Sequence, residues 1–417
     1  MAPGRLLGPG RGGPAGSLWA ILLIALATRL VVLPASHEGN MSPDAAHFLN
    51  VARCVGRGEG FSNPAAWPAW LRPDRLPAPE TFKDPGLPYA IAALTPLMHD
   101  PFRAGQLISL LAGLLLPLAV HALAWRITRD RAVAWVAALI AAGSPVLIAQ
   151  SVRVMAESLF TLLLTLAFVA ASPGETGEGA PRPPPGRSHR ELWAGTLLGL
   201  AFLVRTQALL AIPALALLIV AGATGRDAIA RAARGLIAMA VIASPLVIRN
   251  LRLFGTPFHS DAVTFAVWPF VDPLEFSHAL ARPPAPLAFL AAHGHEVLEH
   301  ATAGLARFGR SALPRDLLGH VAWAPALMAG VAIGIARFRT WAFAWAYLAP
   351  VVLMMSAVSW NTRYFASTAP FWCLLTALGA VWLARRMPGA HRSPAARVVA
   401  AAALAALAGL QTRRAWR

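Results

Sequence analysis

The sequence predicts an all-α polytopic membrane protein with about eleven transmembrane helices, and three observations lead to that prediction. Of its 417 residues, 57% are hydrophobic and only 13% are charged, and the mean hydropathy is +0.56. The hydrophobic residues are gathered in long runs. Arginines are clustered in the short connections between those runs. Soluble globular domains are less apolar and more charged, so we expect the chain to cross a membrane many times.

Several segments approach the roughly 20 apolar residues that a membrane-spanning helix needs. The candidates are 17–34, 104–125, 132–152, 157–172, 192–205, 206–223, 235–251, 321–336, 340–360, 364–384 and 397–411. The first segment has two interpretations. Arg5 and Arg11 before it fit a cleaved signal peptide, whereas Arg29 inside it favours a retained anchor.

The arginine clusters predict the orientation, because short loops rich in arginine stay in the cytoplasm. The clusters are Arg126, Arg129 and Arg131; Arg182, Arg187 and Arg190; Arg226, Arg231 and Arg234; Arg337 and Arg339; and Arg385, Arg386, Arg392 and Arg397. With the N-terminus inside, all of them are cytoplasmic, and the long connections 35–103 and 252–320 lie outside. A tail with Arg413, Arg414 and Arg417 would then end outside, against the rule.

The remaining composition excludes several classes of protein. The net charge is +17, but nucleic-acid binding needs a basic face on a soluble domain, so no nucleic-acid partner is expected. Cys54 and Cys373 are too few and too far apart in sequence for a disulfide framework or zinc site. Segment 173–190, rich in proline and glycine, is expected to be a cytoplasmic linker. We divide the chain into a transmembrane domain, 1–385, and a C-terminal helix with a basic tail, 386–417.

The first long connection is expected to begin with an amphipathic surface helix. Ser42 or Asp44 can cap a helix that runs to about Gly56. Its apolar face consists of Phe48, Val51, Ala52 and Val55. Such a helix suits the membrane surface and would place Asp44 at the boundary between lipid and water. The alternative interpretation of Asp44 is an ordinary helix cap or first-turn acid.

The same connection ends in a tight turn at Pro85-Gly86, directly before an apolar helix. This turn would hold Lys83, the only lysine of the chain, and Asp84 at the membrane edge. The alternative is an ordinary surface turn in which Lys83 and Asp84 form an adjacent ion pair.

Further charged residues occur at the outer ends of apolar segments: Arg153, Glu157, Arg205, Arg249 and Arg363. Arg205 interrupts an apolar stretch, which is costly unless its side chain faces a polar cavity. An arginine at a helix end can also simply snorkel to the interface. For Glu157 the alternative is a structural i,i+4 bridge with Arg153.

The order of several motifs is informative, although each is weak alone. They are Asp44; Gly58-Glu59-Gly60-Phe61; Pro85-Gly86-Leu87-Pro88-Tyr89; Ser144-Pro145 with Glu157-Ser158-Leu159-Phe160; Gly195 with Gly199-Leu200-Ala201 and Arg205; Pro245 with Arg249-Asn250 and Gly255-Thr256-Pro257; and Arg363-Tyr364 with Pro370. Over roughly residues 17–385 this order resembles the polyprenyl-phosphate-dependent glycosyltransferases of the GT-C superfamily. The most similar group is the bacterial relatives of dolichyl-phosphate-mannose–protein mannosyltransferases and aminoarabinose transferases.

The resemblance implies a GT-C-like helix bundle in a bacterial-type inner membrane, with its active site on the extracytoplasmic side. The implied reaction moves a hexose or pentose from a polyprenyl-phosphate donor to a lipid, protein or glycan acceptor, with inversion. Asp44 would be the general base. Cations would bind the donor phosphate: Lys83, Arg205, Arg249 and Arg363. Supporting or acceptor-contacting residues would be Glu80, Asp84, Arg153, Glu157, Asn250 and Tyr364.

One feature departs from the family pattern. Many relatives carry two adjacent acids in the first loop, whereas Ala45 follows Asp44 here, which leaves a divalent metal open and no cofactor assigned. Glu80 or Asp84 could supply a second acid. His259 and Asp261 could reach an acceptor or serve only the loop, and the spacing of His293, His295 and His300 matches no metal-site template.

Two other classes of function remain as alternatives. A polytopic transporter usually has ionisable residues near the middle of the bilayer and related halves with broken helices. A non-catalytic assembly subunit would be consistent with Ala45 in place of a second acid. The sequence does not indicate which sugar or acceptor is used.

Overall fold

The computed structural model describes residues 16–65, 76–172, 189–221, 223–260, 270, 286–358 and 361–386. Several expectations therefore lie outside the described residues: the linker 173–190 apart from its last two residues, the apolar segment 397–411, the basic tail and Asp261. Within the described part, all regular secondary structure is helical apart from a pair of two-residue strands, as the predicted all-α class requires.

The elements follow one another as α1 (Gly16–Val32), η1 (Leu33–Ala35), η2 (Glu38–Asn40), α2 (Pro43–Gly56), β1 (Ser62–Asn63), β2 (Ala78–Pro79), α3 (Gly86–Met98), α4 (Pro101–Thr128), α5 (Arg131–Gly143), α6 (Pro145–Val152) and α7 (Ala156–Ala171). The second half contains α8 (Arg190–Val204), η3 (Thr206–Ala211), α9 (Ile212–Val220), α10 (Gly225–Phe254), α13 (Pro286–Arg307), η6 (Phe308–Leu317), η7 (Val321–Trp323), α14 (Ala324–Ala336), α15 (Phe338–Val358), η8 (Thr362–Thr368) and α16 (Ala369–Arg386).

In the described part, five helical stretches are long and apolar enough to cross a membrane, or up to seven if each of two bent helix pairs counts as one span. The predicted number of about eleven is not confirmed. The predicted span 132–152, for example, is divided into α5 and α6 with a bend of 54°. Pro145 lacks a backbone N–H, and Ser144 before it is extended, so the α5 helix cannot continue through this point.

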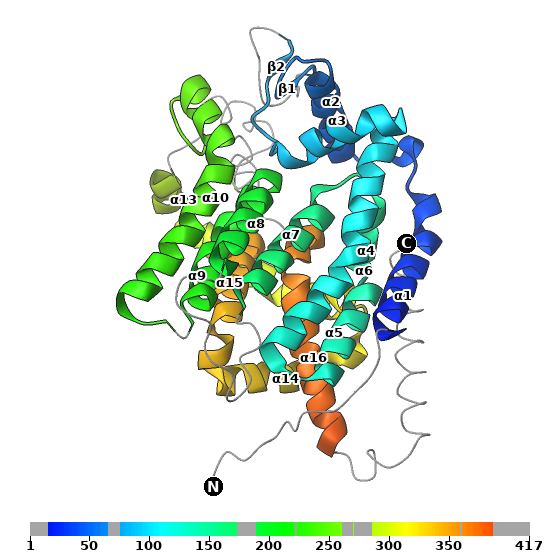
Figure 1. Cartoon of the computed structure of the whole chain (residues 1–417), viewed down its shortest axis with the longest axis vertical. Helices are drawn as coiled ribbons and strands as arrows, with labels where there is room; N and C mark the ends of the chain where they lie inside the picture. The colour runs from blue at the N-terminus through cyan, green and yellow to red at the C-terminus, as the bar shows by residue number, and fades with distance from the viewer. Residues whose placement is uncertain are drawn as a thin grey trace.

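The two ends of the helix bundle differ in what they carry (Figure 1). The upper end in that view carries α2, α3 and the β1–β2 pair. Toward the lower end lie the α4–α5, α9–α10 and α14–α15 connections and the end of α16. These lower connections contain most of the described arginine clusters. The clusters therefore gather at the end opposite the first long connection, as the orientation prediction requires.

Close helix packing brings α8 and α10 side by side. A Cβ atom added to Gly195 of α8 would lie 2.0 Å from the carbonyl oxygen of Gly235 in α10, so only glycine permits this approach. Small residues at such crossings are the usual way in which membrane helices come into contact. Helix α8 is capped by Arg205, and Arg249 lies near the C-terminal end of α10, so the packing of the two helices also places these arginines at the same end of the bundle.

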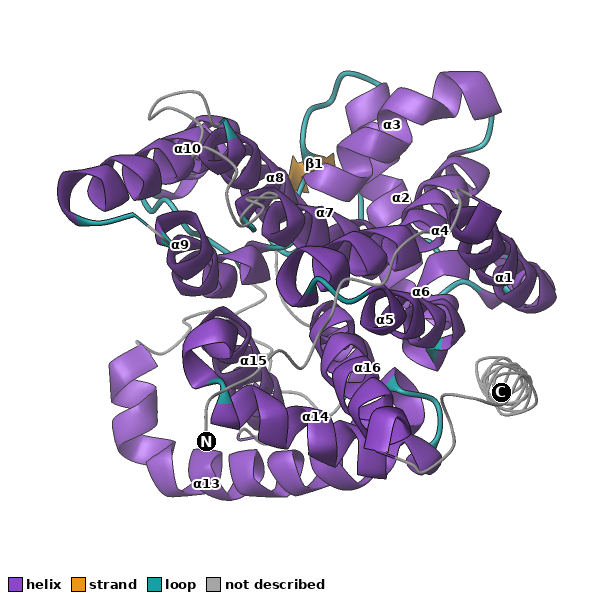
Figure 2. Cartoon of the chain, turned by 60° about the horizontal axis from the view of Figure 1, so that its bottom comes forward, coloured by secondary structure: helices purple, strands orange, loops and turns teal. Residues whose placement is uncertain are grey.

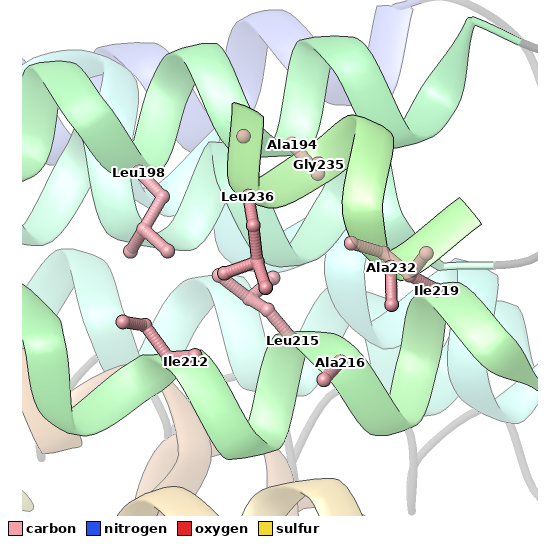
Figure 3. A pocket seen from close by; sticks show the side chains of 10 residues that line it. Ala194, Leu198, Ile212, Leu215, Ala216, Ile219, Ala232, Gly235 and Leu236 are labelled. Atoms are coloured by element: carbon pink, nitrogen blue, oxygen red, sulfur yellow. The ribbon is translucent and has the colours of Figure 1, made fainter. Parts of the chain in front are cut away.

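A pocket of about 310 Å³ lies between α8, α9 and α10 (Figure 3). Its lining consists of Ala194, Gly195, Leu198, Ile212, Leu215, Ala216, Ile219, Ala232, Gly235 and Leu236. None of these side chains carries a polar atom, so the pocket offers no group for catalysis.

The predicted long connection 252–320 contains regular helical structure in its second half. Helix α13 and the π-helical η6 occupy residues 286–317, and α13 packs along α15 (Figure 2). His293 kinks α13, and His300 bonds the carbonyl of Ala357 through Nδ1 at 2.7 Å. Histidines and glutamates interrupt the apolar pattern of α13, which therefore does not stand out in the sequence as a membrane helix.

Helix α1 packs against α4, α5 and α6 of the bundle. Arg29 is fully buried, and its NH1 atom donates to the carbonyl of Ala142 at the end of α5, at 2.9 Å. It also donates to Ala25 within α1 at 3.1 Å. The bond to Ala142 connects the C-terminal part of α1 to the end of α5.

Candidate active site

Charged residues from five separate segments form one chain of ion pairs at the upper end of the bundle. Asp44 contacts the Lys83 ammonium through Oδ1 and Arg363 NH1 through Oδ2, the latter at 2.5 Å. Glu157 Oε1 contacts Arg205 NH1 at 2.7 Å and Arg363 Nε at 4.0 Å. Arg363 thus links the two carboxylates, and we call this group the ion-pair chain. It contains three cations and two carboxylates, so it carries an excess of positive charge.

The start of α2 explains why Asp44 is available for this network. Ser42 is the N-cap and accepts a hydrogen bond from the Ala45 N–H at 3.2 Å. Of the two predicted caps, Ser42 is therefore the correct one. Asp44 lies in the first turn, where the helix dipole favours a negative charge. Of the predicted apolar face, Phe48, Val51 and Ala52 are buried and Val55 is half-buried.

Glu157 occupies the equivalent first-turn position of α7, and its partner is not the one expected as the alternative. The i,i+4 bridge to Arg153 does not form, because Arg153 is exposed at the C-terminal end of α6, where the backbone is extended. Glu157 is 3% exposed and turns toward Arg205 and Arg363 instead. Arg153 is thus outside the ion-pair chain.

Aromatic rings fix the orientation of the cations. The Lys83 ammonium lies 4.6 Å from the centre of the Phe82 ring and 5.0 Å from that of Phe48. The guanidinium groups of Arg363 and Arg205 lie 4.9 and 5.3 Å from the centre of the Tyr364 ring. The Tyr364 hydroxyl accepts a hydrogen bond from Arg363 NH2 at 2.9 Å. Such contacts hold cations in place at little cost in desolvation.

Asp44 and Lys83, which pair with each other in the ion-pair chain, both have shifted pKa values. Burial alone would raise the pKa of Asp44, but the charges and hydrogen bonds of Lys83 and Arg363 outweigh it and lower the pKa to about 2. Burial lowers the pKa of Lys83 by more than Asp44 raises it. The alternative interpretation, an adjacent ion pair between Lys83 and Asp84, is wrong, because the Lys83 ammonium pairs with Asp44.

Glu80 organises the loop that carries Lys83 rather than joining the ion-pair chain. Its Oε1 accepts from the backbone N–H groups of Phe82 and Lys83 at 2.7 and 2.8 Å. Its Oε2 lies 2.7 Å from His47 Nε2 and 3.2 Å from the Asn63 amide. Burial would raise the pKa of Glu80, but His47 and the two amides lower it overall. Apart from the position of His47 one turn after Asp44, no sequence pattern indicated a role for His47 or Asn63.

A cleft of about 340 Å³ opens beside the ion-pair chain. It is lined by Phe61, Glu80, Thr81, Lys83, Asp84, Phe202, Thr206, Leu246, Arg249, Asn250, Pro257, Phe258, His259 and Ser260. Lys83 belongs to both the cleft and the ion-pair chain, which joins the two. Unlike the pocket of Figure 3, this cleft combines aromatic faces with hydrogen-bonding groups, a composition suited to a polar ligand.

Arg249 lies in the cleft and not in the ion-pair chain. Its NH2 group donates to the carbonyls of Phe61 and Glu80 at 3.1 and 2.8 Å, and NH1 donates to the side chain of Asn250 at 3.0 Å. The guanidinium also lies 4.8 Å from the Phe61 ring centre. None of the described carboxylates forms an ion pair with Arg249, so its charge is not neutralised there.

Asp84 faces the same cleft, and its setting is opposite to that of Asp44. Its Oδ2 accepts a hydrogen bond from the Thr206 N–H at 2.9 Å. Burial raises the pKa of Asp84 to about 6, although the Thr206 N–H, Arg205 and Lys83 act in the other direction.

His259, which the sequence proposed as a residue that could reach an acceptor, stacks on Phe254 with 4.1 Å between ring centres. Among the described residues, no group of three histidine, cysteine, aspartate or glutamate side chains could hold a metal ion.

Comparison with known proteins identifies the fold. The chain superposes on the oligosaccharyltransferase AglB of Archaeoglobus fulgidus, in complex with an inhibitory peptide and a dolichol-phosphate, with a TM-score of 0.64 and 15% identity. The alignment covers 96% of this chain and 55% of AglB. ArnT of Cupriavidus metallidurans bound to undecaprenyl phosphate gives a TM-score of 0.57 and 17% identity, over 94% of this chain and 64% of ArnT.

The fold is therefore that of the GT-C membrane enzymes, and the predicted resemblance to this superfamily is confirmed. More particularly, residues 79–248 match the family described as dolichyl-phosphate-mannose-protein mannosyltransferase. This match covers less than half of the chain, and the chain spans little more than half the length of AglB. No curated protein matches the sequence.

Proposed function

We propose that the protein is an integral-membrane glycosyltransferase that moves a sugar from a polyprenyl-phosphate donor to a lipid, protein or glycan acceptor. The observation that carries the proposal is the ion-pair chain, an excess of cations next to a polar cleft at the end of the bundle opposite the arginine clusters. The family match and the lipid phosphates bound by AglB and ArnT support it. By the positive-inside rule, this end faces the extracytoplasmic side of a bacterial-type inner membrane.

The donor phosphate is assigned to the cations of the ion-pair chain. Transfer of the sugar leaves a prenyl phosphate with additional negative charge, and preorganised cations stabilise such a leaving group. Arg363 and Arg205 offer planar groups for paired hydrogen bonds, whereas Lys83 offers a compact charge. Arg249 adds positive charge at the neighbouring cleft, although its N–H groups are bonded to carbonyls and to Asn250.

Asp44 is assigned as the general base, and its contacts imply that the donor must arrive first. Both of its oxygens are held by cations, so Asp44 is a weak base in the free protein. A phosphate that binds Lys83 and Arg363 competes with Asp44 for them. Its arrival would release a carboxylate oxygen and raise the pKa of Asp44 toward its ordinary value. The base would thus become active only when donor is present, which disfavours wasteful reactions in the empty site.

The acceptor is placed in the cleft. Its aromatic faces, Phe61, Phe202 and Phe258, suit the apolar side of a sugar ring or an extended chain, and Asn250 offers hydrogen bonds to hydroxyls. A hydroxyl activated by a single base and attacking the sugar directly would invert the anomeric centre.

The test uses membranes that contain the full chain and a panel of polyprenyl-phosphate sugars. We expect the wild type to transfer one of them to lipid or glycan, and Asp44→Asn to lose transfer by at least about 100-fold while its amount in the membrane is unchanged. Normal turnover by Asp44→Asn would remove Asp44 from the mechanism. A wild type that transports a solute and transfers no sugar would favour the transporter.

A further inference from the structure

The segment that carries Lys83 is docked directly onto the end of α8. Asp84 Oδ2 accepts a hydrogen bond from the Thr206 N–H at 2.9 Å. Two residues further, Gly86 approaches so closely that an added Cβ would lie 2.8 Å from the carbonyl oxygen of Leu203 and 2.7 Å from the side chain of Val204. A larger residue at position 86 would force the two segments apart. Two features therefore hold the Lys83 segment against the end of α8: the hydrogen bond of Asp84 and the close approach of Gly86.

The residues joined by this hydrogen bond each follow a cation of the ion-pair chain. Lys83 precedes Asp84, and Arg205 precedes Thr206, so the bond fixes the two cation-bearing backbones relative to each other. The charges themselves oppose this arrangement, since Arg205 lowers the pKa of Lys83 by repulsion. The half-buried carboxylate of Asp84 lies close enough to both cations to interact with each of them.

We propose that Asp84 is a positioning residue that holds Lys83 and Arg205 at the spacing needed to bind one phosphate group between them. The inference rests on the proposed function, because it assigns the spacing to the donor phosphate. It differs from the use of Asp84 as a second catalytic acid, since in this role the carboxylate need only accept a hydrogen bond and need not exchange a proton.

Asparagine and alanine separate these two roles. Asp84→Asn keeps an oxygen that can accept the Thr206 N–H but cannot act as a base at neutral pH. Asp84→Ala removes the acceptor. Thr206→Pro removes the donor from the other side, and the extended backbone of Arg205 (φ −154°, ψ 123°) is compatible with a following proline. Thr206 is the first residue of η3, where a proline is tolerated.

The experiment measures binding of polyprenyl phosphate to the purified, membrane-reconstituted full chain, together with KM for the donor and kcat. For Asp84→Ala and Thr206→Pro we expect a rise of about 10-fold in the Kd for polyprenyl phosphate and a matching rise in KM. Asp84→Asn should stay within about 3-fold of wild type in Kd, KM and kcat. Asp84→Ala and Thr206→Pro break the same hydrogen bond. The double variant should therefore lose about as much affinity for polyprenyl phosphate as either single variant.

Asp100→Ala is the matched control. Asp100 is also an aspartate that accepts a backbone N–H at the start of a helix, from Phe102 at 2.8 Å, but it does not touch the ion-pair chain. We expect its loss to leave the Kd for polyprenyl phosphate unchanged.

Three outcomes would overturn the inference, and they are distinguishable. If Asp84→Asn loses kcat as severely as Asp84→Ala while both bind polyprenyl phosphate like wild type, Asp84 takes part in the chemistry instead. If neither Asp84→Ala nor Thr206→Pro changes Kd, the hydrogen bond positions nothing. If the wild type does not bind polyprenyl phosphate at all, the proposed function itself fails, and this inference with it.

Discussion

Two buried glutamates at opposite ends of the bundle show how similar contacts can serve different purposes. Glu157 and Glu191 lie in the first turns of α7 and α8, are 3% and 2% exposed, and each contacts an arginine at 2.7 Å. Glu191 forms a closed pair with Arg234, which also donates Nε at 2.9 Å. Glu157 is instead one member of a longer chain with excess positive charge.

The cavities near these glutamates differ in the same way. The apolar pocket of Figure 3 and the polar cleft have similar volumes, about 310 and 340 Å³. The pocket starts one turn after Glu191 and has no polar side chain, whereas the cleft shares Lys83 with the ion-pair chain. Burial of an arginine–glutamate pair is therefore a weak sign of function. An open network with unbalanced charge beside a polar cleft is a stronger one.

The largest expected effect comes from Arg363, which alone touches both carboxylates. Arg363→Ala should reduce transfer by about 10²–10³-fold, because it removes a cation at the leaving phosphate and breaks the link between Asp44 and Glu157. Arg363→Lys should recover little, since an ammonium cannot bond Asp44 and Tyr364 and face Glu157 at the same time. Initial rates in membranes with equal protein amounts would measure both. Full recovery by lysine would show that only charge matters.

The direct comparison uses matched glutamine substitutions. Glu157→Gln should reduce transfer by about 10-fold, because Arg205 and Arg363 lose the carboxylate that orients them. Glu191→Gln should leave transfer per folded molecule unchanged and lower stability by about 1 kcal/mol, since Arg234 stays partly exposed and solvated. Transfer rates and thermal unfolding in detergent would be measured for both. Equal losses of activity would mean that the two glutamates have the same structural role.

The smallest expected effect concerns stability and pH. The pKa of Asp84 is raised to about 6 from an ordinary value of 3.8, so its ionisation opposes folding, and this cost grows as pH rises from about 4 to 6. The charged groups around it are Lys83 and Glu80 on its own loop, Arg205 at η3 and Arg249 across the cleft, with His259 also lining it. Asp84→Asn should therefore unfold at a higher temperature than wild type above pH 6.

This advantage of Asp84→Asn should shrink toward pH 4. Asp44 has the opposite sign, because its pKa is lowered to about 2, so its contribution to stability is present above about pH 4 and lost below it. Unfolding temperatures of wild type and Asp84→Asn in one detergent from pH 4 to 7 give the difference directly. A constant difference across this range would contradict the raised pKa.

Much of the fold could be predicted because it follows from patterns along the chain. The apolar runs correspond to helices, and the arginine clusters lie at one end of the bundle. Pro85-Gly86 corresponds to the turn before α3. The break at Pro145 and the helix α13 could not be predicted, because the prediction of spans rests on the number of apolar residues. A single proline hardly lowers that number, and α13 contains too many polar residues to reach it.

The site was predicted as a set of charged residues, and most of them do meet. Asp44, Lys83, Glu157, Arg205 and Arg363 form the ion-pair chain, whereas Arg153 is exposed elsewhere. Their pairing could not be predicted, because neighbours in sequence, such as Lys83 and Asp84, point to different partners in space. The supporting contacts of His47 and Asn63 depend entirely on tertiary structure.

The most direct test of the central claim, that the ion-pair chain is the site of the donor phosphate, is the affinity of the Asp44→Asn protein for polyprenyl phosphate. Removal of this carboxylate leaves Lys83 and Arg363 without their competitor, so we predict binding about 10-fold tighter than wild type together with loss of transfer. Glu191→Gln should bind like wild type. Unchanged or weaker binding by Asp44→Asn would place the phosphate elsewhere and contradict the account.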